Sequence, residues 1–302
     1  EIMAGDWSSD VCSSDLRKVN STGVGLGLHA RRILAYVVLI IVSFFCLFWF
    51  YVLFVNATRS NSNLQSGFSV LPSSNLLSNW KHLLEKSGLP VIQGMLNSLI
   101  ISTCSAVVCV YFSTMTAYAI HVYDFKLKKF IYPFILAVMM IPTQVTALGF
   151  VNLVSDMNLE DSFIPLIIPQ IAVPITFFYM KQYMESSLPL SLVEAARIDG
   201  SGEFRTFNHI VLPLMKPAIA VQAIFTFVSS WNNYFIPALI LHDDSKKTLP
   251  ILIAQLRAAD WLKFDMGQVY IMIAFSIFPV IVVYLILSKH IVQGVALGSV
   301  KG

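Results

Sequence analysis

Residues 33–55 read ILAYVVLIIVSFFCLFWFYVLFV, a run of 23 residues without a charged side chain. A bilayer core of about 30 Å needs about 20 apolar residues in an α-helix, so this run predicts a membrane span. Five further apolar runs follow, at residues 91–120, 130–155, 163–180, 217–241 and 269–288. Because backbone that crosses lipid must satisfy its own hydrogen bonds, we expect an all-α polytopic membrane protein with six transmembrane helices.

The composition of the 302-residue chain agrees with a place in the bilayer. Hydrophobic residues make up 56% and charged residues only 12%, against about 25% charged residues in soluble globular domains. These values exclude an ordinary soluble enzyme and a disordered protein. The formal net charge of +3 is too small to indicate a nucleic-acid partner. The four cysteines form no CxxC pair or Cys/His cluster, so we predict no metal site.

The basic residues predict the orientation of the spans. If the amino end is cytoplasmic, the cytoplasmic segments hold thirteen of the 20 lysines and arginines and the opposite segments hold seven. The short loop 124–129 contains three lysines, whereas loop 156–161 contains three acids and no base. Cytoplasmic loops are enriched in basic residues, so we expect both termini in the cytoplasm.

The chain divides into four expected parts. Residues 1–16 read EIMAGDWSSDVCSSDL and have neither period nor membrane character, so we expect a non-native leader and leave it out of the fold. A cytoplasmic tail is expected at 17–32, the six-span transmembrane domain at 33–289, and a second cytoplasmic tail at 290–302.

Polar residues interrupt three of the spans. The fifth run carries Ser-Ser-Trp-Asn-Asn-Tyr at 229–234, which we expect near the middle of a helix. Asn232 and Asn233, unpaired in hydrocarbon, would each cost several kcal/mol, so they face either a partner helix or a wet cavity. Breaks at Pro142, shortly before Gln144, and at the prolines around Gln170 are typical of kinked helices with a water-containing core. No charged residue lies in the middle of a span, which argues against an ion-driven secondary transporter.

The long cytoplasmic loop 181–216 predicts a helix-turn-helix. Ser191 and Glu194 have the spacing of a capping box at the start of a first helix. Gly200 suits the left-handed turn that ends it, and a second helix runs from Glu203 toward Pro213. Such a hairpin either docks on a partner or lies on the membrane surface without one.

The residues of this loop resemble the EAA loop of ABC importer permeases, the inner membrane components of binding-protein-dependent transport systems. The resemblance implies a coupling segment at 191–213. Its ATPase-coupling residues are Glu194, Ala195, Ala196, Asp199, Gly200, Ile210, Leu212 and Pro213. Within this family the chain is similar to the carbohydrate-uptake branch, in particular to the maltose-transporter-type six-span permease. That likeness rests on Asn97-Ser98 and on the candidate substrate-path residues Trp231, Asn232, Asn233 and Tyr234, among others.

The resemblance also implies partners and a location. The expected partners are a homologous second permease, an ABC ATPase dimer, an extracytoplasmic sugar-binding protein and the lipid bilayer of a bacterial inner membrane. Glu194 would contact the ATPase, with small residues Ala195 and Ala196 beside it. The chain carries no P-loop, so we expect a non-enzymatic subunit without a cofactor, whose partner ATPase binds ATP and magnesium.

Two alternatives remain beside the sugar importer. One is a self-sufficient secondary transporter or channel, which predicts ionisable residues within the spans. The other is a permease of the same family for a phosphorylated polyol such as glycerol phosphate, which would need a cation in its path. An intramembrane enzyme is not favoured, because the spans contain no catalytic constellation.

Overall fold

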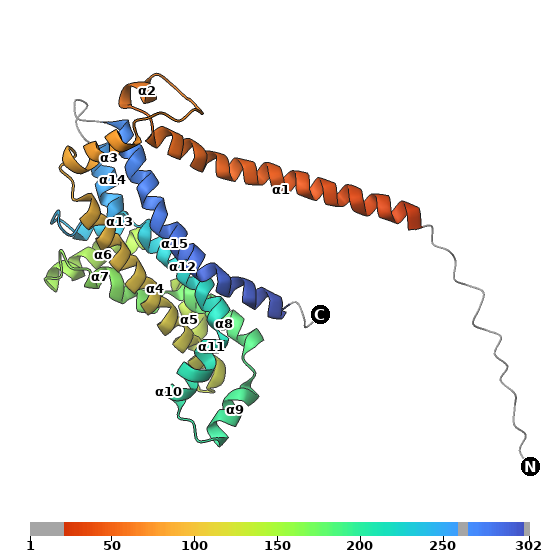
Figure 1. The fold of residues 1–302 in the computed structure, drawn as a ribbon. Coiled ribbons are helices and arrows are strands. Elements are labelled where there is room, and N and C mark those ends of the chain that lie inside the picture. The colour runs from red at the N-terminus through yellow and green to blue at the C-terminus, as the bar shows by residue number, and fades with distance from the viewer. Residues whose placement is uncertain (1–20, 259–264, 299–302) are drawn as a thin grey trace, which may run out of the picture. The chain divides into compact units, whose positions relative to one another are not determined.

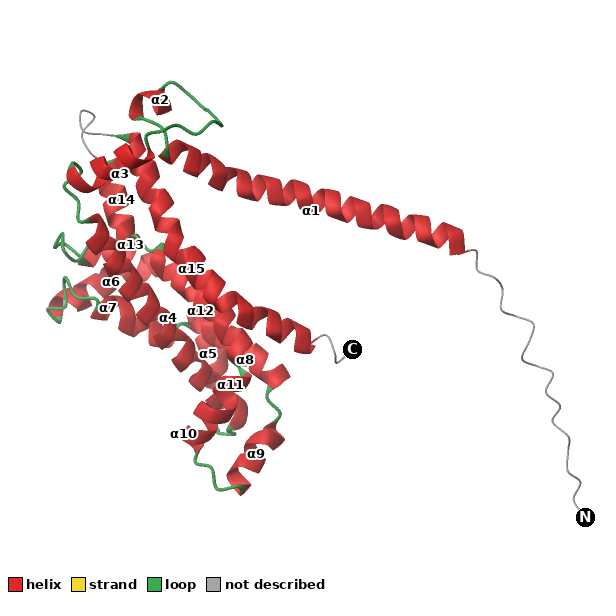
Figure 2. Cartoon of the chain, viewed as in Figure 1, coloured by secondary structure: helices red, strands yellow, loops and turns green. Residues whose placement is uncertain are grey.

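This computed structural model describes residues 21–258 and 265–298. The expected leader at 1–16 lies outside the described residues. All regular elements of the described part are helices (Figure 2), as the sequence predicts for an all-α protein. The helices contain four stretches long and apolar enough to cross a membrane, or up to six when each bent pair counts as one span.

The chain divides into two units, residues 1–53 and 54–302. Helix α1 (Ser21–Ala57) makes up the described part of the first unit and ends inside the second. It is already helical from Ser21, so the expected tail at 17–32 is largely part of the first helix.

The second unit contains the remaining elements (Figure 1). Its amino-terminal half comprises α2 (Asn61–Gln65), α3 (Leu76–Glu85), α4 (Val91–Val122), α5 (Lys128–Val138), α6 (Thr143–Asp156), α7 (Ile164–Ile167), η1 (Ile168–Ala172) and α8 (Pro174–Ser187). Its carboxy-terminal half comprises α9 (Leu190–Ile198), α10 (Glu203–Thr206), η2 (Phe207–Val211), α11 (Leu212–Leu214), α12 (Lys216–Trp231), α13 (Phe235–Ile240), α14 (Leu249–Arg257) and α15 (Met266–Gly298). The last helix therefore continues into the expected carboxy-terminal tail.

Three of the expected spans are broken, and the fourth divides into α7, η1 and α8. The third run divides into α5 and α6, which meet at an angle of 97°, with Pro142 at the N-cap of α6. Proline lacks a backbone N–H, and it disfavours a helical conformation at the residue before it, so a new helix starts after it. The fifth run breaks after Trp231, and Asn232 is the C-cap of α12. Our expectation that the two asparagines lie inside a continuous helix was wrong.

Helix α4 is the centre of the second unit. It packs against α12, α8, α14 and η1. Three apolar clusters hold these helices together. One cluster, around Met180, Met184 and Met215, joins α4 and α8 to the segment after α9. Helix α4 runs between two ends of the unit: α9 and α10 lie at one end, and α3 and α14 lie at the other (Figure 1).

Candidate coupling hairpin and translocation cavity

The segment between α8 and α12 forms the predicted hairpin. Helix α9 ends at Ile198 with Asp199 as its C-cap, and Gly200 follows with a φ of +77°. The Ser201 amide donates to the Ala196 carbonyl at 2.9 Å, which closes the left-handed helix end that glycine favours. The turn at Gly200 and the second helical segment from Glu203 are confirmed. The expected capping box is wrong: α9 begins at Leu190 after Pro189, so Ser191 already lies within its first turn.

Helix α9 has one exposed and one buried face. Glu194, Ala195 and Ile198 are exposed, and Ile198 retains 86% of its accessible surface. Val193 and Ala196 are buried. Ala195 and Ala196 therefore face different ways, because consecutive helical residues point about 100° apart. Of the two alanines, Ala195 is exposed together with Glu194, and Ala196 is buried.

The second arm of the hairpin, residues 203–215, packs through residues that are neighbours in sequence of the predicted coupling residues. Val211 and Met215 are fully buried in the cluster with Val193. The motif residues themselves are more open. Ile210 and Leu212 are half-buried, whereas Asp199 and Pro213 are exposed. The second arm thus presents its predicted coupling residues at or near the surface.

A polar cluster of Arg197, Glu203 and Tyr118, called the latch below, joins the hairpin to α4. Arg197 Nε lies 2.7 Å from Glu203 Oε1, and the Tyr118 hydroxyl donates to Glu203 Oε2 at 3.0 Å. The Arg197 guanidinium also lies 5.5 Å from the centre of the Tyr123 ring. The hydrogen bond from Arg197 holds the pKa of Glu203 below its usual value, so Glu203 is ionised at neutral pH. Sequence reasoning missed this latch, because Tyr118 and Glu203 are 85 positions apart.

A cavity of about 530 Å³, called the central cavity below, lies where three helix breaks meet. Gln144 comes from the first turn of α6, Gln170 from η1, and Asn233 from the break after α12. Ser229 and Ser230 of α12 add hydroxyl groups. None of the described side chains that line the cavity is ionisable. The cavity offers neutral hydrogen-bonding groups, which suit an uncharged polar solute.

The four candidate substrate-path residues separate in the structure. Asn233 lines this cavity. Trp231 is buried and stacks on Phe227 with ring centres 5.7 Å apart, and Asn232 Nδ2 donates to the Val228 carbonyl of its own helix at 3.0 Å. Tyr234 lines a different cavity, of about 350 Å³. The sequence had indicated Gln144 and Gln170 only as polar residues near helix breaks.

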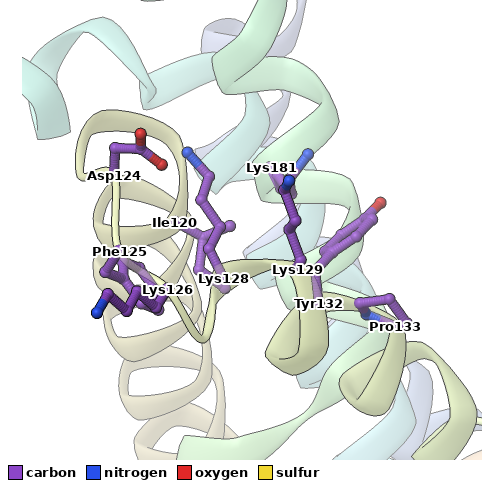
Figure 3. Close-up of a pocket in the computed structure, with 9 residues that line it drawn as sticks. All are labelled: Ile120, Asp124, Phe125, Lys126, Lys128, Lys129, Tyr132, Pro133 and Lys181. Atoms are coloured by element: carbon purple, nitrogen blue, oxygen red, sulfur yellow. The ribbon is translucent and has the colours of Figure 1, made fainter.

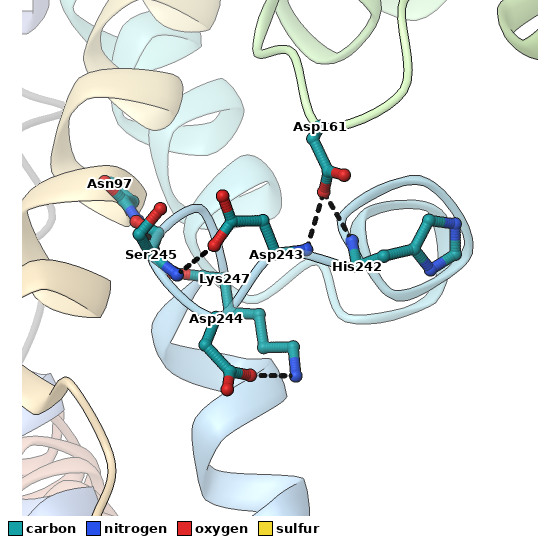
Figure 4. A network of polar contacts seen from close by, with 7 residues as sticks. All are labelled: Asn97, Asp161, His242, Asp243, Asp244, Ser245 and Lys247. Atoms are coloured by element: carbon teal, nitrogen blue, oxygen red, sulfur yellow. Dashed lines mark hydrogen bonds and ion pairs between the residues drawn. The ribbon is translucent and has the colours of Figure 1, made fainter.

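At the opposite end from the hairpin, the loop before α14 is held by residues from distant segments (Figure 4). Asp161 Oδ1 accepts hydrogen bonds from the amides of His242 at 2.6 Å and Asp243 at 2.8 Å. Asn97 Nδ2 donates to the carbonyls of Ser245 and Lys247, both at 2.9 Å.

This loop is further stabilised by a local bond and by α4. The Ser245 amide donates to Asp243 at 2.8 Å and lowers the pKa of that carboxyl. Ser98 Oγ accepts from the Leu249 amide at 2.8 Å. Asn97 and Ser98, which contribute to the family likeness, thus anchor this loop and the start of α14. Among residues 21–258 and 265–298, no group of three or more His, Cys, Asp or Glu side chains could hold a metal ion.

Comparisons with known proteins agree with this architecture. The family "Binding-protein-dependent transport system inner membrane component" matches residues 110–297. The arabinooligosaccharides transport system permease protein AraQ of Bacillus subtilis is 36% identical over 68% of this chain and 72% of its own length. The sn-glycerol-3-phosphate transport system permease protein UgpE of Yersinia pestis is 31% identical over 87% of this chain and 95% of its own.

A solved structure gives the same fold. A chain from a bacterial ABC transporter involved in the import of the acidic polysaccharide alginate aligns with a TM-score of 0.73. The alignment covers 86% of this chain and 96% of that chain at 22% identity, so it bears on the fold alone. Since the family match covers more than half of the chain, the protein belongs to the family of binding-protein-dependent transport system inner membrane components.

Proposed function

We propose that this chain is a permease subunit of an ATP-driven ABC importer and forms half of the translocation path for a sugar or oligosaccharide. The observation that carries the proposal is the convergence of Gln144, Gln170 and Asn233 at three helix breaks around one uncharged cavity. Amides and hydroxyls hydrogen-bond sugar hydroxyls without requiring a charge. The similarity to a permease named for arabinooligosaccharides supports this class of cargo.

The hairpin is the proposed contact with the ATPase. Its exposed face, Glu194, Ala195 and Ile198, combines one acid with a small and an apolar residue. ATP binding would close the ATPase dimer and move the hairpin. The latch at Glu203 would pass that movement to α4, in a switch between two states of the path.

The remaining subunits follow from this role. A second, homologous permease completes the path, an extracytoplasmic sugar-binding protein delivers the cargo, and the ATPase subunits bind ATP and magnesium. Both termini lie in the cytoplasm of a bacterial cell whose inner membrane holds the chain. The excess of lysines in loop 124–129, at the hairpin end of α4, supports this orientation.

Phosphorylated cargo is the less favoured alternative. The UgpE relatives are named for sn-glycerol-3-phosphate and align over most of this chain. A phosphate ester, however, needs cationic partners, and the described lining of the central cavity contains none.

Co-purification tests the proposed function. The tagged chain is extracted from its host in mild detergent, and the accompanying proteins are identified by mass spectrometry. We expect a second permease and an ATP-binding subunit, and uptake of a neutral sugar by the reconstituted assembly. Recovery of this chain alone, active as a monomer or homo-oligomer, would contradict the proposal and favour a self-sufficient transporter.

A further inference from the structure

A basic cavity of about 830 Å³ lies near the hairpin end of α4, apart from the central cavity (Figure 3). Four lysines line it, together with one acid, Asp124. These are Lys126, Lys128, Lys129 and Lys181. Three of them come from the short connection between α4 and α5 and the first turn of α5, and the fourth comes from α8. The transport mechanism proposed above uses none of these side chains.

Among the described residues, Lys181 is the one cavity lysine that forms an ion pair. Lys181 is buried, pairs with Glu185 at 2.5 Å and lies 4.4 Å from the centre of the Tyr132 ring. Lys128 Nζ donates to the Tyr123 carbonyl at 3.1 Å, which is a neutral partner. Lys126 and Lys129 are exposed.

The ammonium groups of Lys128, Lys129 and Lys181 point to the same side of the cavity, whereas Lys126 points elsewhere (Figure 3). The eleven-residue helix α5 also begins at Lys128, and the amino end of a helix carries partial positive charge. The cavity therefore concentrates positive charge and favours an oxyanion, above all a phosphate.

The surface beside the cavity is apolar. Leu127, Phe130 and Phe134 retain 64%, 68% and 57% of their accessible surface. The rings of Phe130 and Phe134 are stacked, with centres 6.0 Å apart. A basic cavity next to exposed apolar side chains, between two membrane-spanning segments, matches the two chemical parts of a phospholipid.

We propose that this cavity binds the headgroup of an anionic phospholipid, such as phosphatidylglycerol, with its acyl chains along Phe130 and Phe134. Inorganic phosphate offers the same oxyanion, but it makes no use of the apolar strip, so the observations favour the lipid. The site goes beyond the proposed transport function and does not depend on the cargo or on the ATPase.

Native mass spectrometry of the full chain, with the subunits that accompany it, tests the site. The protein is delipidated in mild detergent and titrated with phosphatidylglycerol or phosphatidylethanolamine. We expect phosphatidylglycerol to bind more tightly. Lys128→Gln with Lys129→Gln should weaken that binding by about 25-fold, because each lysine near an anionic surface contributes about fivefold.

The matched control is Lys81→Gln with Lys86→Gln, which removes the same charge from α3 and the residue after it, at the opposite end of the unit. It should leave phosphatidylglycerol binding unchanged. Lys129→Gln alone keeps the bond between Lys128 and the Tyr123 carbonyl. It should weaken binding by about fivefold, and it tests the site even if the double variant fails to insert.

Three results would overturn the proposal. The first is equal binding of the two lipids, and the second is equal loss in the α3 control and the cavity variants. The third is inorganic phosphate that competes with phosphatidylglycerol at equal concentration, which would reassign the cavity to soluble phosphate compounds. Loss of the lipid site leaves the co-purification of ATPase and second permease unaffected, so this test and the test of transport fail independently.

Discussion

The Tyr118 hydroxyl of α4 donates a 3.0 Å hydrogen bond to Glu203 at the start of α10, and this bond joins the hairpin to the central helix. Tyr118 is buried, and its ring also packs on Phe207 of the hairpin, with ring centres 5.6 Å apart. Helix α4 has 32 residues, or about 48 Å, and its other half contributes Ser98 and Ile101 to the central cavity. A single rigid helix therefore connects the coupling hairpin with the proposed path.

The first prediction concerns this latch. Tyr118→Phe should lower sugar uptake per ATP hydrolysed, because the hairpin would move with less effect on α4. Combined with Glu203→Gln, it should show a coupling energy of about 1 kcal/mol in a double-mutant cycle of thermal unfolding. Tyr179→Phe, at an exposed position of α8, is the control and should change neither quantity. Additive effects of the two latch substitutions would argue against a direct interaction.

The second prediction concerns the exposed face of α9. Glu194→Lys should reduce uptake to background while membrane insertion stays intact, because the side chain is exposed and the substitution reverses a charge at the proposed ATPase contact. Glu160→Lys makes the same charge reversal in an exposed loop between α6 and α7 and should be neutral. Uptake and co-purified ATPase are measured in parallel. Normal uptake by the Glu194 variant would remove this residue from the coupling site.

The third prediction separates the two adjacent asparagines. Asn233→Leu should lower uptake by about fivefold, the value of one lost hydrogen bond of about 1 kcal/mol, because Asn233 lines the central cavity. Asn232→Leu should have little effect, since Asn232 bonds to its own helix. Initial uptake rates at equal expression compare the two variants. Equal losses would indicate a structural role for the pair rather than contact with the cargo.

The fourth prediction concerns Asp161, which has a φ of +55° and accepts two backbone hydrogen bonds. Asp161→Asn retains an acceptor oxygen and tolerates this backbone conformation, so it should be nearly neutral. Asp161→Ala loses both bonds and strains the turn, and should lower the free energy of unfolding by about 2 kcal/mol. Hydrogen exchange at the His242 and Asp243 amides should accelerate in the alanine variant alone. Unchanged exchange there would show that Asp161 does not hold the loop.

Local features were predictable from the sequence, and long-range contacts were not. The apolar runs, the turn at Gly200 and the helix start at Glu203 depend on neighbouring residues, and the structure has them at the expected places. The end of α12 before Asn232 was missed, because apolar composition alone does not show where a helix terminates.

The partners of polar side chains were harder to predict. Ala196 is buried because of the side of α9 on which it lies. The family motif gives the residue types and spacing, but it does not say which side of the helix packs against the rest of the protein. The latch at Glu203 joins segments that are far apart in the chain. Gln144 and Asn233 are also far apart in the chain, and they line the same cavity. Such contacts depend on how the helices pack, and no pattern of spacing in a single sequence contains that information.

The uncharged lining of the central cavity has an electrical consequence. Moving one elementary charge through 100 mV requires about 2.3 kcal/mol, but none of the described residues around this cavity carries a charge that could move in the field. A neutral solute that passes through it performs no electrical work. In the proposed importer, accumulation of such a solute would depend on the phosphorylation potential of ATP and would persist in a depolarised cell.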